Sequence, residues 1–181
     1  MKGIRNVRLL SSIDKMLLTG VLCACAAASQ AQAPNPLDNV PEKMPNDIPY
    51  GAPIALDRAE KVLDAALAES QKRSWKLVCA IVDSGANLVA LKRMDGAQLA
   101  SINIAGDKAR AAVQFRRETK ALEAGIQAGN NYLLSLNGVV ASRGGVPLMD
   151  GGKMIGAIGC SGGTGAQDEV VAKAGVAALS Q

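Results

Sequence analysis

The 181-residue sequence contains no histidine, and this absence removes several functions from consideration. Residues 159–163 read Gly-Cys-Ser-Gly-Gly and match G-x-S-x-G, the pattern that carries the nucleophilic serine of many hydrolases. That chemistry needs a base to accept the serine proton, and the base is normally histidine. We therefore interpret these glycines as a tight connection between a strand and a helix, where glycine permits a positive φ angle.

Aromatic residues are also scarce, since one tryptophan, two tyrosines and one phenylalanine make up 2% of the chain. A deep aromatic pocket cannot be assembled from so few side chains in one subunit. We find no pair of residues suited to general acid and base catalysis, so the sequence leans against an enzyme. A phosphate-binding loop is excluded as well, because the glycine-rich stretch lacks the lysine that such loops carry.

The first 33 residues predict an export signal that is removed from the mature protein. Basic residues precede a short apolar core, and Ala31-Gln32-Ala33 is a typical cleavage pattern. The stretch Leu22-Cys23-Ala24-Cys25 resembles a lipoprotein signal, in which Cys25 would carry the lipid. We expect a periplasmic or secreted protein, and the only membrane contact that we expect is through such a lipid anchor.

Removal of this signal also changes the charge of the protein. The formal net charge of +4 comes from 20 basic and 16 acidic residues, of which residues 1–33 hold four and one. The mature chain therefore has 16 basic and 15 acidic residues, a net charge of +1. This near-neutral balance gives no indication of a nucleic-acid partner.

Six of the seven prolines fall in residues 34–53, which therefore read as an extended linker. Residues 54–181 are the right length for one domain. Hydrophobic patterning predicts a helix capped by Asp57, a buried strand over 77–82 and a return strand over 88–94. The remaining expected elements are helices over 99–113 and 117–124, an edge strand over 139–142, strands over 146–149 and 154–161, and a final helix opened by Thr164 and Gln167.

Hairpins joined by short turns imply an antiparallel sheet, and the helices between them must cover it. The predicted fold class is α+β, a profilin-like layered domain with an antiparallel sheet of about five strands covered by helices.

Several short motifs recur in a specific order along residues 54–181. They are Ala80-Ile-Val-Asp83-Ser-Gly85, Leu91-Lys-Arg93-Met94-Asp95-Gly96-Ala97, Lys108-Ala109, Gly144-Gly145-Val146-Pro147, Gly156-Ala-Ile-Gly159-Cys-Ser161-Gly162 and Gln167-Asp168-Glu169. This ordered set resembles the GlcG/HbpS family of haem-binding proteins, whose domain also forms the C-terminal part of PduO-type proteins. The resemblance implies the layered antiparallel fold and a homo-oligomer.

The resemblance further implies an exported protein that binds haem or another tetrapyrrole and acts as a carrier, buffer or sensor accessory. Two alternatives stay open. The protein is a structural or partner-binding oligomer without catalysis, or it is an accessory of small-carboxylate metabolism of the glycolate or diol type. No histidine can serve as the axial ligand of haem iron in this chain.

The candidate ligand-binding residues form one cluster in the sequence: Arg116, Arg117, Thr119 and Lys120. Guanidinium groups match carboxylates, so the basic members are candidates to bind haem propionates or another carboxylated ligand. The alternative is that they form a solvated helix start paired with nearby glutamates.

Three residues are candidates to ligate iron. The resemblance suggests Thr119, and sulfur chemistry adds Cys160 and Met149. Cys79 and Cys160 are the only cysteines outside residues 1–33. Both fall in predicted apolar strands, so they are equally interpreted as small buried hydrophobic residues, or as a disulfide if their strands are neighbours.

Overall fold

The protein is described by a computed structural model that covers residues 38–180. The predicted signal over 1–33, the candidate lipid-bearing Cys25 and the first part of the predicted linker lie outside the described residues. The chain from Pro41 onward belongs to one compact unit.

Four antiparallel strands form a single sheet in the order β2-β1-β4-β3. The fold is α+β, as predicted, but the sheet has four strands rather than five. No strand forms over residues 139–142, because the next backbone N–H, that of Arg143, donates to the Glu123 carboxylate instead of a neighbouring strand. The strands are β1 (Val78–Asp83), β2 (Leu88–Arg93), β3 (Gly145–Asp150) and β4 (Lys153–Ser161).

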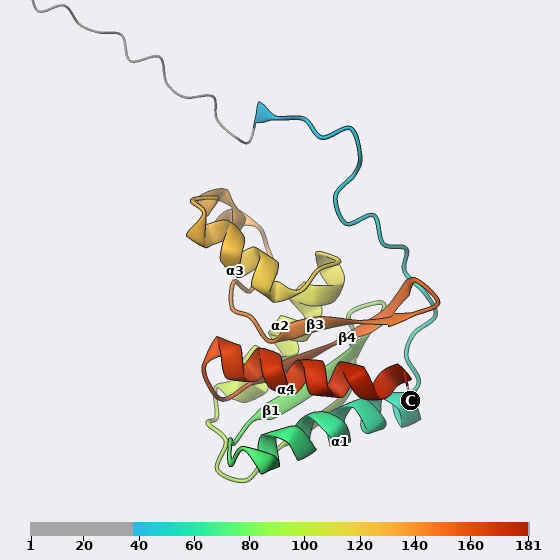
Figure 1. The fold of residues 1–181 in the computed structure, drawn as a ribbon, viewed down its shortest axis with the longest axis vertical. Helices are drawn as coiled ribbons and strands as arrows, with labels where there is room; N and C mark the ends of the chain where they lie inside the picture. The colour runs from blue at the N-terminus through green and yellow to red at the C-terminus, as the bar shows by residue number, and fades with distance from the viewer. Residues whose placement is uncertain (1–37, 181) are drawn as a thin grey trace, which may run out of the picture. The chain divides into compact units, whose positions relative to one another are not determined.

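Helices cover both faces of this sheet. Helices α1 (Leu56–Lys72) and α4 (Gly165–Ala177) lie side by side on one face (Figure 1). Helix α2 (Ser101–Gln114) covers the opposite face. Helix α3 (Thr119–Gln127) lies beyond the edge strand β3, and the short 3-10 helix η2 (Asn131–Ser135) follows it.

Strand β1 shows why the layers hold together. It is buried on both faces, as its continuous apolar run predicts. Cys79 and Ile81 pack with α1 and α4, while Val82 packs with α2. Beside it, a Cβ at Gly159 of β4 would lie 2.0 Å from the Ala105 carbonyl oxygen. Glycine at this position therefore lets α2 rest directly on the sheet.

The start of α4 confirms the predicted capping box. The Gln167 N–H donates to Thr164 Oγ1 at 3.3 Å, and the Thr164 N–H donates to Gln167 Oε1 at 2.8 Å. The predicted cap of α1 is wrong, because that helix begins one residue before Asp57, with Ala55 as its N-cap and no side-chain cap. Among residues 38–180, no helix is both long and apolar enough to cross a membrane.

Candidate functional site

A cavity of about 640 Å³ lies between α3, β3, the end of α4 and the segment around residues 46–48, which precedes α1. This volume falls within the usual range for small-molecule sites. Its lining is mostly apolar beneath a charged rim. The lining residues are Asn46, Ile48, Arg116, Arg117, Glu118, Lys120, Ala121, Ala124, Val146, Pro147, Met149 and Val176.

The apolar floor follows from the way α3 and β3 meet. Ala121 and Ala124 lie one turn apart on α3, so their small side chains leave room above β3. Val146 and Pro147 of β3 form the opposite side. Pro147 is tolerated because β3 is an edge strand. The floor therefore suits a flat apolar ligand.

All three predicted basic residues lie at this cavity, but their surroundings differ. Arg116 Nη1 donates to the Ile48 carbonyl at 3.1 Å and lies 3.7 Å from Asp47 Oδ1. Lys120 Nζ lies 3.2 Å from Glu169 Oε1. These two cations are therefore already engaged within the protein.

Arg117 is engaged differently. Its Nε donates to the Phe115 carbonyl at 3.0 Å, and within residues 38–180 no carboxylate forms an ion pair with it. A guanidinium has five N–H donors in a fork that matches a carboxylate. Arg117 is therefore the member of the basic cluster best placed to bind an anionic ligand.

Thr119 does not line the cavity. The residue is fully buried, and its Oγ1 accepts the Gly145 N–H at 2.9 Å. A Cβ at Gly145 would lie 2.6 Å from the Thr119 methyl, so the two residues fit closely. The structure gives Thr119 the role of fixing the start of β3, one residue before the cavity floor begins.

The two candidate sulfur ligands of iron lie in different environments. Met149 lines the cavity and is 37% exposed, so its thioether is accessible to a ligand there. Cys160 forms a disulfide with Cys79, directly opposite it on β1, and both residues are fully buried. The structure thus favours the disulfide alternative for Cys160 over iron ligation, because thiolate ligation requires a free sulfur.

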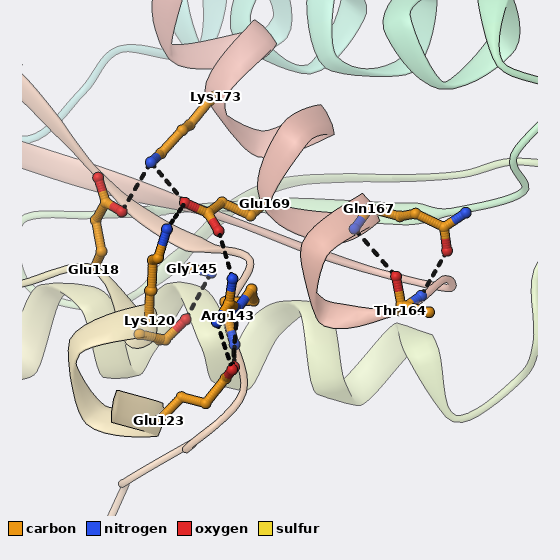
Figure 2. A network of polar contacts seen from close by, with 10 residues as sticks. Glu118, Lys120, Glu123, Arg143, Gly145, Thr164, Gln167, Glu169 and Lys173 are labelled. Carbon is orange, nitrogen blue, oxygen red and sulfur yellow. Dashed lines mark hydrogen bonds and ion pairs between the residues drawn. The ribbon is translucent and has the colours of Figure 1, made fainter. Parts of the chain in front are cut away.

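Beside the cavity, a network of charged residues surrounds Glu169 of α4 (Figure 2). Its carboxylate lies 2.7 Å from Lys173 Nζ and 3.5 Å from Arg143 Nη1. Arg143 also donates to Glu123 through both Nε and Nη2, at 3.0 and 2.8 Å. The network joins the first half of α3 to α4 and so fixes two sides of the cavity.

The network shifts the proton affinities of its carboxylates. The hydrogen bond from Arg143 holds the pKa of Glu123 below its ordinary value of 4.5. Burial pushes the pKa of Glu169 upward, but the hydrogen bonds from Lys173 and Lys120 outweigh it, and the net shift is downward. The hydrogen bond to Glu169 raises the pKa of Lys173 in turn. All three groups are therefore charged near neutral pH.

A buried ion pair that the sequence patterns did not predict joins α2 to α4. Lys108 of α2 and Asp168 of α4 are 2% and 3% exposed, and their Nζ and Oδ2 atoms lie 2.7 Å apart. Lys108 Nζ also donates to the Cys160 carbonyl at 3.2 Å, while Asp168 Oδ1 accepts the Gly163 N–H at 3.0 Å. Burial raises the pKa of Asp168, against the opposing effect of Lys108.

A sequence signal for this pair did exist. Lys108 falls on the same helical face as Ala105, Ala109 and Ala112, all of which are fully buried. A lysine on an apolar stripe requires a buried acidic partner.

No catalytic arrangement emerges around the hydrolase-like motif. Ser161 Oγ donates to Ser101 Oγ at 3.2 Å, and both residues are buried. Within residues 38–180, no group of three metal-ligating side chains lies close enough together to hold a metal ion. The lining of the cavity offers a ligand apolar contact and cationic donors.

Comparison with known proteins identifies relatives of this chain. Residues 54–177 match the sequence model of a family described as haem degrading protein HbpS-like. Protein GlcG of Escherichia coli strain K12 is 40% identical over 108 residues, which cover 60% of this chain and 81% of that protein.

Solved structures are similar as well. The crystal structure of a PduOC:heme complex is 30% identical with a TM-score of 0.64, over 70% of this chain and 95% of that chain. The crystal structure of HbpS is 28% identical with a TM-score of 0.66, over 75% of this chain and 96% of that chain.

Proposed function

The chain belongs to the HbpS-like family of haem-degrading proteins, and from that premise we propose that it binds haem or a related tetrapyrrole in the cavity beside α3. The observation that carries the proposal is an apolar floor beneath a rim with an arginine, Arg117, that has no acidic partner among residues 38–180. A structure of the similar PduOC protein holds heme, which supports this ligand class.

The residues at the cavity fit such a ligand. Alanine, valine and proline side chains provide the apolar surface that a porphyrin face requires. Arg117 would bind a propionate through its free donors, and Lys120 would add a second cation at the cost of its contact with Glu169. Met149 is the residue that would offer sulfur to the iron.

Haem, when bound, would supply an iron centre able to bind small ligands and to exchange electrons. The protein's own contribution is to hold and shield the ligand. Since the chain has no histidine, we expect micromolar binding, about −8 kcal/mol. The functional role that we propose is that of a carrier, buffer or sensor accessory.

Haemin titration followed in the Soret region tests this proposal. Arg117→Gln should weaken binding about tenfold, because it removes a charge-assisted hydrogen bond worth roughly 1.5 kcal/mol. Arg110→Gln is the matched control, since Arg110 is a surface arginine of α2 outside this cavity and is paired with Asp107. Wild-type protein without a saturable Soret change would contradict the assignment of haem.

A second variant tests the iron side of the cavity. Met149→Leu conserves volume and removes the thioether. We expect it to shift the Soret and visible bands of the complex while leaving the haemin affinity within about threefold of wild type. Bands identical to those of wild type would show that Met149 does not ligate the iron.

A small carboxylate is the second candidate ligand, and the relation to GlcG favours it. It would use Arg117 and Lys120 but would leave the apolar floor uncovered. Isothermal titration with glycolate separates the two ligands. Saturable glycolate binding that Arg117→Gln abolishes, without haemin binding, would establish this alternative in place of the tetrapyrrole.

We also propose that the protein works outside the cytoplasm. The signal-like sequence over 1–33 supports this, and so does the Cys79–Cys160 disulfide, since such bonds persist mainly in oxidising compartments. Mass spectrometry of the protein from its native host should find a mature N-terminus between residues 25 and 34. An added diacylglyceryl mass on Cys25 would identify a lipid anchor.

Self-association is part of the same proposal. The outer edge of β2 is unpaired among the described strands, and Leu88 and Leu99 are 52% and 76% exposed. Light scattering at tens of micromolar protein should report more than one subunit. A monomer at that concentration would contradict this part.

A further inference from the structure

Residues 46–50 form one wall of the cavity, although they precede the family match at 54–177 and fall within the predicted linker. Asn46 and Ile48 both line the cavity. Ile48 is half-buried and packs against the core cluster that includes Val113 and Met154. This segment is therefore in contact with both the ligand cavity and the core beneath α2.

Backbone hydrogen bonds attach the end of this segment to the sheet. The Met154 N–H donates to the Pro49 carbonyl at 2.9 Å, and the Gly51 N–H donates to the Met154 carbonyl at 2.8 Å. Tyr50 pairs with Met154 as an isolated parallel bridge. The Tyr50 hydroxyl donates to the Val113 carbonyl at 2.9 Å. These bonds hold residues 49–51, so the residues before Pro49 need a further anchor.

Arg116 provides that anchor. Its Nη1 donates to the Ile48 carbonyl, and the same atom lies near Asp47 Oδ1. Its guanidinium also lies over the Tyr50 ring, with 5.3 Å between Cζ and the ring centroid. One side chain thus contacts three residues of the segment.

Arg116 has a backbone conformation that is uncommon for residues other than glycine. Its φ angle is +51°, at a position just after α2 where glycine would be free of steric cost. The chain carries an arginine here, and its side chain reaches the segment over 46–50. Arg116 and Arg117 are neighbours with different partners, since Arg117 makes no contact with this segment among the described hydrogen bonds and ion pairs.

We propose that residues 46–50, anchored by Arg116, are a ligand-retaining wall of the cavity. Ile48 covers the apolar ligand from the side opposite α3, and Arg116 holds that wall instead of binding the ligand's carboxylate. The inference rests on the proposed function for the identity of the ligand, but the existence of the wall and its anchor can be tested without it. Removal of the anchor should speed ligand release.

Hydrogen exchange of the free protein tests the anchor. Arg116→Gly removes the guanidinium and suits the positive φ angle, so the fold should persist. Exchange over residues 46–51 should become about tenfold faster in this variant. Ser74→Gly is the matched control, since Ser74 also has a positive φ, +56°, and lies outside this cavity. Tyr50→Phe, which removes only the bond to Val113, should give a smaller increase.

Ligand release tests the wall. Arg116→Gly should raise the haemin dissociation rate about tenfold, while Ser74→Gly leaves it unchanged. Arg117→Gln should weaken haemin binding without changing exchange over residues 46–51. If Arg116→Gly leaves the exchange of 46–51 unchanged, the anchor is refuted. If exchange rises but haemin release does not, the segment is not a wall of the site.

Failure of the proposed function remains distinguishable from failure of this inference. If the wild type binds no haemin, the apolar anion 8-anilinonaphthalene-1-sulfonate serves as the probe, since it needs an apolar floor and a cation. Weaker dye binding by Arg116→Gly than by Ser74→Gly would still support the wall. Equal dye binding by the two variants would overturn it.

Discussion

Removal of the Lys108 side-chain charge should destabilise the protein in a manner that depends on pH. In Lys108→Met, the buried carboxylate of Asp168 loses the ammonium 2.7 Å away and keeps only backbone N–H donors such as that of Gly163. Breaking one partner out of a buried ion pair typically costs about 3–5 kcal/mol. Asp168 can, however, neutralise this buried charge by taking up a proton.

Protonation of Asp168 limits the loss of folding free energy that the unpaired carboxylate can cause. A carboxyl group with the ordinary aspartate pKa of 3.8 lies about 3.2 pH units from neutrality, and each unit corresponds to about 1.4 kcal/mol. Protonation at pH 7 therefore costs about 4.4 kcal/mol, which is the largest penalty that the stranded charge can impose. At pH 5 the same ceiling is about 1.6 kcal/mol. The destabilisation by Lys108→Met should thus shrink as the pH falls.

Asp168→Asn should also destabilise the protein. It leaves the buried Lys108 ammonium without its carboxylate, and it removes the carboxyl group whose protonation makes the effect of Lys108→Met depend on pH. Urea unfolding of the wild type, both single variants and the double variant between pH 5 and 9 gives all four free energies. The double variant should be more stable than the sum of the single effects predicts. A destabilisation by Lys108→Met that does not shrink as the pH falls would refute a charged pair at this site.

Three further predictions concern the frame around the cavity. The double variant Cys79→Ala, Cys160→Ala should lower the free energy of unfolding by about 4 kcal/mol, since the disulfide closes a loop between residues 81 positions apart. In urea unfolding, reductant should destabilise the wild type but not this variant. The folded pKa of Glu123 lies below its ordinary value of 4.5, so its contribution to stability is present above pH 4.5 and is lost as the pH falls through the folded pKa. Glu123→Gln should therefore flatten the acid side of a plot of melting temperature against pH. The control Glu60→Gln, at an exposed residue, should leave that plot unchanged. Gly159→Ala should destabilise the protein by at least about 2 kcal/mol, because the added Cβ would meet the α2 backbone. In the control Gly106→Ala the added Cβ meets only the flexible end of Arg110, so thermal unfolding should show no change or a stabilisation of about 0.5 kcal/mol.

Much of the fold could be predicted because its signals are local. The apolar run that became β1, the Asp150-Gly151-Gly152 turn between β3 and β4, and the capping residues of α4 each specify an element by themselves. The strand expected over 139–142 failed because pairing at a sheet edge is decided by neighbours that the sequence does not place side by side. Here the Glu123 side chain takes the Arg143 N–H that a ladder would have used.

The candidate site was predicted in part. The sequence brought Arg116, Arg117 and Lys120 together because they are close along the chain, and the structure places Met149 of β3, already a candidate iron ligand, at the same cavity. It could not show that Thr119 turns inward to Gly145. The wall formed by residues 46–50 was also missed, because a proline-rich composition reports on local stiffness and not on long-range contact. Differences among the three cations come from their partners, which only the folded chain determines.

The bond between Cys79 and Cys160 has a consequence for the integrity of the chain. It joins the two central strands, so α2, α3 and β3 all lie inside one covalent ring. Tyr132 and Leu134 in the η2 segment of that ring are 51% and 67% exposed, which makes this stretch an accessible target for a protease. A cut there would leave two fragments that still migrate as one species until they are reduced. The walls of the cavity on either side of the cut would remain tethered to the same pair of strands, so a nicked molecule would keep the cavity residues in one covalent unit.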